Sequence, residues 1–278
     1  MLPINSFRVQ FISPSKPLSP LDQDCMKSSA SRHCERSEAI QNIAEGQAHN
    51  DHWIASGYRP RNDDATHLSH SIAPSKKERN SVGCLDEIES ARVALEGGCR
   101  WIQLRMKGAS LEEVEQVALQ LKPLCKSYNA VFLLNDHVEL CKKVGADGVH
   151  LGKTDMNPRE ARQLLGTDFI IGSTCNTFED IENLRDTQID YIGLGPFRFT
   201  ETKQNLSPIL GLEGYKNIVS QCKKSNINIP IVAVGGITAD DVVPILQTGI
   251  DGIALSSAIL RAEDPGEEMR KIDKMIKI

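Results

Sequence analysis

The 278-residue sequence lacks the features that mark several large classes of protein. It has no apolar run near the roughly 18 residues of a membrane span, and its first residues do not have the charged-then-apolar order of a signal peptide. Its eight cysteines stand singly and never as Cys-x-x-Cys, so we expect a reducing cytoplasm rather than a disulfide framework. A formal net charge of −5 argues against a concentrated basic surface. We therefore expect neither nucleic acid nor a membrane as partner.

Residues 14–82 lack any sustained period in their apolar positions and are rich in Ser, Pro, Asn, Asp, Arg and His. A segment of this composition cannot bury enough apolar surface to offset the entropy lost on ordering. We therefore expect residues 14–82 to be a disordered insertion of low order. The alternative is that the natural chain begins near Ser81. Before this segment, residues 7–13 contain the alternating run Phe7–Ile12, which predicts a strand.

From residue 83 onward, short apolar runs alternate with helical patterns. A capping box of Ser110 and Glu113 opens the longest predicted helix, and Gly97-Gly98 ends the helix before it. The predicted strands are Arg100–Arg105, Ala130–Leu134, Gly148–Leu151, Asp168–Gly172, Tyr191–Leu194, Ile229–Val234 and Gly252–Leu255. The predicted helices are Asp86–Leu95, Leu111–Ser127, Val138–Val144, Pro158–Leu165, Phe178–Leu184, Leu212–Lys223, Ala239–Gln247 and Glu267–Ile276.

Seven strands after residue 98, together with Phe7–Ile12, make eight, the number that closes a barrel. Alternating strands and helices indicate a parallel sheet. The competing fold is an open doubly wound sheet, but the Gly-x-Gly-x-x-Gly signature that follows its first strand is absent. We therefore expect a single α/β domain over residues 1–278. It would be a (β/α)8 TIM barrel with a long insertion between the first strand and the first helix.

Polar residues gather where the predicted strands end, and such barrels build their sites at that face. Gln103, Arg105 and Lys107 are spaced by two, so they share one face of their strand and predict a receptor for a multiply charged anion. Asp136 and Asp155 follow the next two strands and could hold Mg2+ together with phosphate oxygens. The alternative is that each of these aspartates caps the helix that follows it.

A second group of hydroxyls, glycines and one lysine predicts a phosphate site at the same face. Its members are Thr200, Thr202, Lys203, Gly235, Gly236, Ser256 and Ser257, and Thr174 could meet a phosphate or a ring nearby. A Mg2+-bound diphosphate is a leaving group, so the two sites together predict transfer of an alkyl-type group onto a second, phosphorylated substrate. His150 is expected to be a packed, hydrogen-bonded histidine. The sequence has no Cys–His or Ser–His pair with a clear triad role, so we do not expect a covalent enzyme intermediate.

The chain resembles thiamine-phosphate synthases from Cys84 almost to its C-terminus. Five ordered motifs carry the resemblance: Gln103-x-Arg105-x-Lys107, Asn135-Asp136, Gly148-Val149-His150-Leu151-Gly152-x-x-Asp155, Gly195-Pro196 through Thr200-x-Thr202-Lys203, and Gly235-Gly236-Ile237. The resemblance implies that hydroxymethylpyrimidine diphosphate is joined to a thiazole phosphate with the help of Mg2+, through a dissociative reaction in which diphosphate leaves first. Three departures stand out: Thr174 replaces a common Ser, His137 replaces a frequent Arg, and the insertion follows the first strand.

The resemblance also implies a role for each residue at the site. Binding of the pyrimidine diphosphate would involve Gln103, Arg105, Lys107, Asn135, Thr174 and Lys203, among which Arg105, Lys107 and Lys203 would be catalytic. Binding of the thiazole phosphate would involve Thr200, Thr202, Gly236, Ser256 and Ser257, and Mg2+ would be held by Asp136 and Asp155. Two other functions stay open, a thiazole tautomerase-like isomerase and a non-catalytic barrel that binds a phosphorylated ligand. The sequence also leaves homo-oligomerisation open.

Overall fold

The computed structural model describes residues 9–12, 41–42, 85–199 and 208–276. The chain divides into two compact units, one of residues 1–45 with 84–278 and one of residues 46–83. The second unit lies outside the described residues, as does most of the insertion predicted over residues 14–82. Within that insertion, Gln41–Asn42 form a short strand, β2, which the pattern of apolar residues did not indicate.

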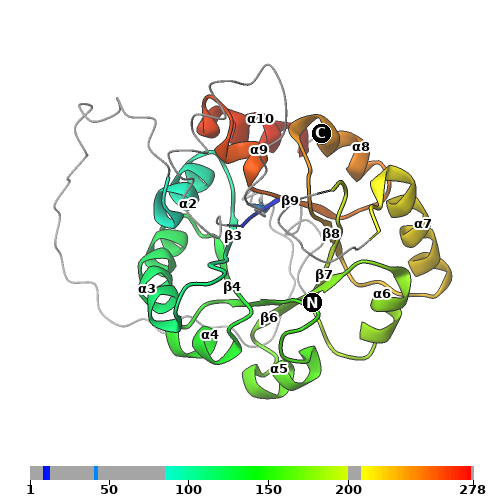
Figure 1. Cartoon of the computed structure of the whole chain (residues 1–278), viewed down its shortest axis with the longest axis horizontal. Coiled ribbons are helices and arrows are strands. Elements are labelled where there is room, and N and C mark those ends of the chain that lie inside the picture. Colours follow the sequence, from blue (N-terminus) through cyan, green and yellow to red (C-terminus); the bar gives the residue numbers. More distant parts are fainter. Residues whose placement is uncertain (1–8, 13–40, 43–84, 200–207, 277–278) are drawn as a thin grey trace, which may run out of the picture. The chain divides into compact units, whose positions relative to one another are not determined.

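Seven parallel strands form a curled sheet in the first unit (Figure 1). They follow one another in chain order, which confirms the seven strands predicted after residue 98. Their bounds are β3 Trp101–Leu104, β4 Val131–Asn135, β5 Gly148–Leu151, β6 Ile170–Cys175, β7 Tyr191–Leu194, β8 Ile231–Ala233 and β9 Gly252–Leu255. Strand β1, Val9–Ile12, pairs in parallel with both β9 and β3, and β2 pairs with β3 in the antiparallel direction.

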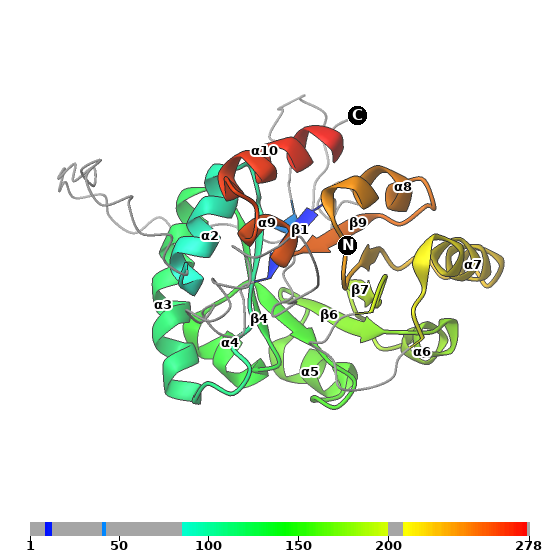
Figure 2. The same cartoon turned by 45° about the horizontal axis from the view of Figure 1, so that its top comes forward.

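Helices alternate with these strands and cover the outer face of the sheet (Figure 1, Figure 2). Their bounds are α2 Glu87–Glu96, α3 Leu111–Ser127, α4 Val138–Val144, α5 Pro158–Leu165, α6 Phe178–Leu184, α7 Gly211–Lys224, α8 Val242–Leu246, α9 Ser257–Leu260 and α10 Pro265–Ile276. None of the described helices is both long and apolar enough to cross a bilayer.

Two helical details differ from the sequence prediction. The helix predicted over Ala239–Gln247 begins as a separate 3-10 turn, η2, at Ala239–Asp241, and only then continues as α8. The Asp241 carboxylate accepts hydrogen bonds from the amide and the hydroxyl of Thr238, which tightens this first turn. The short helix α9 directly after β9 was not predicted. By contrast, the predicted capping box of Ser110 and Glu113 is confirmed.

Every position of β3, β5, β7 and β9 is buried, because the helices cover one face of the sheet and the other face packs in its interior. Large aromatic side chains contribute to this core. The rings of Trp101 in β3 and Tyr191 in β7 meet edge to face, with centroids 5.6 Å apart. Side chains across the interior therefore join β3 and β7, which are not neighbours in the sheet.

Three aspartates, which we call the strand-start aspartates, lie directly before β5, β7 and β9. Asp147, Asp190 and Asp251 each bind the preceding strand twice, through the backbone and through the side chain. Their carboxylates accept hydrogen bonds of 2.7–2.8 Å from the amides of Phe132, Ile171 and Ile231, and their own amides donate to the carbonyls of the same three residues. These bonds fix the strand register at the end of the sheet opposite the predicted site.

Candidate active site

Two polar side chains meet at the ends of β3 and β4. Gln103 is fully buried, and its Nε2 donates a hydrogen bond to Oδ1 of Asn135 at 2.7 Å. The Oε1 atom of Gln103 is buried and has no hydrogen-bond partner within the described ranges. Arg105, two residues further along, is only 6% exposed. The structure thus brings Gln103 and Asn135 together and buries the first cation of the predicted anion receptor beside them.

The carboxyl groups of Asp136 and Asp155 interact at the ends of β4 and β5. Burial, followed by the adjacent Asp155 carboxyl, raises the pKa of Asp136 to about 7. Burial would also raise the pKa of Asp155, but hydrogen bonds from Asp136 and from the Gly152 amide, together with the charge of Lys107, lower it overall. The interaction thus moves the pKa values of the two carboxyls apart, while the positive charge of the exposed Lys107 lowers both.

Neither Asp136 nor Asp155 caps a helix, so the capping alternative is wrong. His137 is the N-cap of α4, and Asn157 is the N-cap of α5. Asp136 instead adopts a left-handed backbone with φ of 69°, which aspartate tolerates better than most residues. Its amide donates to the His150 carbonyl at 2.9 Å and so ties the end of β4 to β5. The backbone thus holds one carboxylate over the end of the neighbouring strand.

The two interacting carboxyls form a donor set that suits a divalent cation. Burial, and after it the neighbouring Asp155 carboxyl, raises the pKa of Asp136, and a bound cation would favour the ionised form of both carboxyls. Mg2+ takes one or two protein carboxylates and completes its shell with water and phosphate oxygens. No cluster of three or more His, Cys, Asp or Glu side chains that could hold a metal occurs among the residues that the structure describes. Asp136 and Asp155 therefore fit a Mg2+ ion shared with a substrate.

His150 is packed and hydrogen-bonded on both ring nitrogens, as the sequence predicted. Its Nδ1 lies 2.9 Å from the hydroxyl of Tyr191, and its Nε2 lies 3.0 Å from the hydroxyl of Thr174. Sequence reasoning missed Tyr191, whose hydroxyl fixes the histidine from inside the sheet. No local pattern marks this residue, because only the register of β6 and β7, which sets Gly172 opposite Tyr191, brings its ring to the site.

Glycines make room for these rings. A Cβ on Gly172 would lie 2.2 Å from the ring of Tyr191, and a Cβ on Gly193 would lie 2.8 Å from the ring of His150. Both distances are far below ordinary contact between carbon atoms, which is about 3.5–4.0 Å. The rings of Tyr191 and His150, and with them the contact to Thr174, therefore require glycine at positions 172 and 193.

The predicted phosphate residues after β8 and β9 lie in two tight loops. Gly235 and Gly236 both have left-handed φ angles, 95° and 68°, which favour glycine. A Cβ on Gly235 would lie 3.0 Å from Pro196, so the loops after β7 and β8 touch at this point. Ser256 is 3% exposed, and its hydroxyl oxygen has no hydrogen-bond partner in the described ranges. Ser257 begins α9 next to it.

The predicted residues Thr200, Thr202 and Lys203 lie outside the described residues. The base of their loop is described and firmly anchored. Phe197 is buried and stacks on Tyr215, with ring centroids 5.7 Å apart. The amide of Phe197 donates to the Val234 carbonyl at 3.0 Å, so the loop leaves β7 alongside the end of β8.

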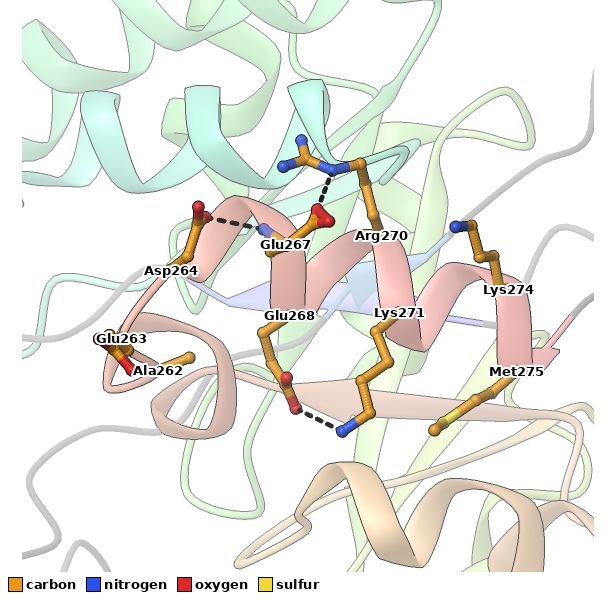
Figure 3. A pocket seen from close by; sticks show the side chains of 9 residues that line it. All are labelled: Ala262, Glu263, Asp264, Glu267, Glu268, Arg270, Lys271, Lys274 and Met275. Atoms are coloured by element: carbon orange, nitrogen blue, oxygen red, sulfur yellow. Dashed lines mark hydrogen bonds and ion pairs between the residues drawn. The ribbon is translucent and has the colours of Figure 1, made fainter.

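A separate hollow lies over α10 and the turn that precedes it (Figure 3). It is lined mainly by charged side chains that pair with neighbours on the same helix. Glu267 binds Arg270 at 2.7 Å, and Glu268 binds Lys271 at 3.7 Å (Figure 3). None of the predicted site residues lines this hollow. Its ion pairs are typical of a solvated helix face, so the strand ends remain the candidate site.

The family model described as thiamine monophosphate synthase matches residues 77–259. The chain belongs to this family. A curated thiamine-phosphate synthase from Bacteroides thetaiotaomicron is 65% identical over 190 residues, which cover 68% of this chain and 91% of the relative. One from Flavobacterium psychrophilum is 47% identical and covers 69% and 93%. A solved thiamine phosphate pyrophosphorylase from Pyrococcus furiosus aligns with a TM-score of 0.62 at 36% identity, covering 69% of this chain and 89% of that chain.

Proposed function

We propose that the chain is a transferase that condenses hydroxymethylpyrimidine diphosphate with a thiazole phosphate, giving thiamine phosphate and releasing diphosphate. The observation that carries this proposal is the cluster at the ends of β3, β4 and β5. A buried amide pair, a buried arginine and two interacting carboxyls stand together there beside an exposed lysine. Two curated relatives named thiamine-phosphate synthase are 65% and 63% identical to this chain over 91% of their own length, which supports the same reaction here.

The cluster suits the pyrimidine diphosphate. Gln103 offers a buried oxygen without a partner in the described ranges, which an N–H group on the pyrimidine would satisfy. Arg105 and Lys107 would stabilise the negative charge that grows on the departing diphosphate. Asp136 and Asp155 would hold Mg2+, which, when bound, supplies further positive charge to the diphosphate oxygens.

The opposite part of the site suits the thiazole phosphate. Gly236 lies in the loop after β8, and Ser256 and Ser257 lie where β9 passes into α9, so backbone amides and a hydroxyl can converge on one phosphate. The hydroxyl of Ser256, which has no partner among the residues that the structure describes, supports this assignment, because a buried hydroxyl needs a partner. Thr200 and Thr202 would add hydroxyls to the same phosphate, and Lys203 would reach from that loop to the diphosphate.

Positioning, rather than a nucleophile of the protein, would drive this reaction. The two substrates would lie between the strand ends with the thiazole nitrogen facing the pyrimidine methylene carbon, and Thr174 would contact the pyrimidine side. The described cysteines are poor nucleophiles, since burial raises the pKa of both Cys125 and Cys141 to about 12. That chemistry agrees with a dissociative reaction in which diphosphate leaves before the new carbon–nitrogen bond forms.

We also infer that β1 closes the curled sheet into an eight-stranded (β/α)8 barrel. The support is its parallel pairing on both sides, with Val9 opposite Ile253 of β9 and Phe11 opposite Ile102 of β3. The chain would then be one barrel domain, interrupted between its first strand and first helix by the segment that contains residues 14–82. A reducing cytoplasm suits the five described cysteines, all of which are free and buried.

Release of diphosphate that requires Mg2+ and both substrates tests the proposed reaction. Single-turnover measurements on the Asp136→Ala and Lys203→Ala variants would then test the two groups proposed to act on the departing diphosphate from different loops. A tautomerase would convert a thiazole compound without any pyrimidine diphosphate, and it would not need the cation and carboxylate cluster. Absence of diphosphate release from pure, folded protein would refute the synthase proposal. Binding of thiazole phosphate without turnover would favour a non-catalytic barrel.

A further inference from the structure

One arginine joins the loop after β7 to the loop after β8. The guanidinium of Arg198 makes a two-pronged ion pair with Asp241, in which Nη2 donates to Oδ1 at 2.6 Å and Nη1 donates to Oδ2. Nη1 also donates to the carbonyl oxygen of Gly236 at 3.1 Å. The guanidinium lies over the ring of Phe197, 4.8 Å from its centroid. Contacts on several sides thus fix the orientation of a side chain that is 50% exposed.

The backbone amide of Arg198 binds a second carbonyl of the loop after β8. The amide of Arg198 donates to the Gly235 carbonyl oxygen at 3.0 Å. Two consecutive carbonyls, those of Gly235 and Gly236, therefore turn toward Arg198. In a planar trans peptide the N–H points opposite to the C=O, so the amides of Gly236 and Ile237 point away from Arg198. Within the described ranges, neither of these two amides donates to another backbone carbonyl.

Two further contacts make this arrangement rigid. Asp241, which receives the guanidinium, is itself fixed by the amide of Thr238 at 2.9 Å and by its hydroxyl at 2.7 Å. The left-handed φ angles of Gly235 and Gly236 allow the chain to present both carbonyls on one side. The arginine therefore connects the base of one loop to both ends of the short turn that follows β8.

We propose that Arg198 is a positioning residue for the phosphate of the second substrate. By holding the carbonyls of Gly235 and Gly236, it directs the amides of Gly236 and Ile237 at that phosphate. Successive backbone amides that point the same way form a common anion site in proteins. This inference rests on the proposed function, in which Gly236 belongs to the thiazole phosphate site. Arg198 acts through the loop after β8, and Asp241 keeps its guanidinium in place.

Calorimetric titration of the full chain with two ligands tests this role. The ligands are the thiazole phosphate and the corresponding thiazole alcohol, which lacks the phosphate. Arg198→Lys keeps the positive charge but removes the two-pronged geometry. We expect it to weaken binding of the thiazole phosphate about tenfold, as the loss of one oriented, charge-assisted contact does. Binding of the thiazole alcohol should not change.

Asp241→Asn provides a second, independent variant. It should weaken binding of the thiazole phosphate by a similar factor. The double variant should lose little more affinity than either single variant, because the two side chains act as one unit. Arg185→Lys is the matched control. Its exposed guanidinium donates to the Ser225 carbonyl at 2.5 Å between the ends of α6 and α7. Its replacement should change the binding affinity for neither ligand. Melting temperatures of all variants report whether each one is folded.

Three outcomes would count against these ideas, and they can be told apart. Equal weakening of both ligands by Arg198→Lys would overturn the proposal and show a general packing role. No weakening of either ligand by Arg198→Lys and Asp241→Asn would also overturn it. If the unaltered chain bound the thiazole phosphate no more tightly than the alcohol, the phosphate site of the proposed function would itself be wrong.

Discussion

Replacement of Gly172 by alanine adds one methyl group where the ring of Tyr191 packs directly against the strand. The new Cβ would lie 2.2 Å from two ring carbons of Tyr191 and 2.6 Å from its hydroxyl oxygen. Carbon atoms in ordinary contact are about 3.5–4.0 Å apart, so the ring must move by about 1 Å or more. Tyr191 is fully buried, packs edge-on against Trp101 and bonds His150, so it has nowhere to move without losing a contact.

The size of the effect follows from these contacts. Overpacking of a buried position costs about 1–3 kcal/mol, and loss of the hydrogen bond between Tyr191 and His150 adds about 1 kcal/mol. Alanine also restricts the unfolded chain, which offsets about 0.4–1 kcal/mol. We expect Gly172→Ala to lower the free energy of unfolding by about 2–3 kcal/mol, equivalent to about 4–12 °C in melting temperature. A displaced His150 also moves Thr174, so kcat/KM should fall about ten- to a hundredfold.

Urea unfolding followed by circular dichroism, together with steady-state kinetics, measures both effects. Gly266→Ala is the matched control, because it makes the same change within α10. There the nearest atom to the new Cβ is Asp264 Oδ1 at 3.4 Å, and alanine is the better helix former by about 0.5–1 kcal/mol. This control should be neutral or slightly stabilising. The reasoning is refuted if Gly172→Ala unfolds at the wild-type urea concentration, or if both variants lose the same stability.

Three further predictions concern other parts of the molecule. Asp136→Asn should lower Mg2+-dependent turnover about 100-fold or more at an unchanged melting temperature, since one of the two proposed cation ligands is lost; wild-type rates across a Mg2+ titration would contradict this. Burial raises the pKa of Asp180, but its ion pair with Lys153 and backbone amides lower it overall, so the ionised carboxylate stabilises the fold above about pH 4 and less as pH falls through its native pKa. Asp180→Asn should therefore melt about 2–4 °C below wild type at neutral pH, with the gap closing in acid; a gap that persists there would count against it. Deletion of residues 15–80 should leave turnover largely intact, because the family model matches only residues 77–259; loss of folding would show that this segment is structural.

The regular elements could be predicted closely because local patterns determine them. The bounds of α3, Leu111–Ser127, follow from its capping box and the helical spacing of its buried residues Val114, Ala118, Leu121 and Cys125. Strand β6 was predicted to end at Gly172 but extends to Cys175. Its last residues include Ser173 and Thr174, whose hydroxyls look like loop chemistry in the sequence. In the structure they continue the strand, because polar side chains are tolerated where strands end in a site.

The contacts that orient the site could not be predicted, because they join residues far apart in the chain. Arg198 and Asp241 are 43 positions apart, and only the adjacency of β7 and β8 brings their loops together. Asp136 shows the opposite error. The sequence offered a helix cap as an alternative, but His137 occupies the cap position of α4, and Asp136 has a left-handed backbone instead of the extended one typical of a cap. Local patterns thus indicated which residues are polar at the strand ends, and strand register determined which of them meet.

The strand-start aspartates affect where the chain can accept an insertion without loss of strand register. Each one joins two consecutive strands, β4 with β5, β6 with β7, and β8 with β9, so three of the four pairs formed by the parallel strands are clasped independently. The remaining pair is β1 with β3, and the long segment from residue 13 to residue 84 separates these two strands in the chain. A chain built of clasped pairs can receive an insertion within one pair while the other three pairs keep their alignment, and with it the strand ends of the candidate site.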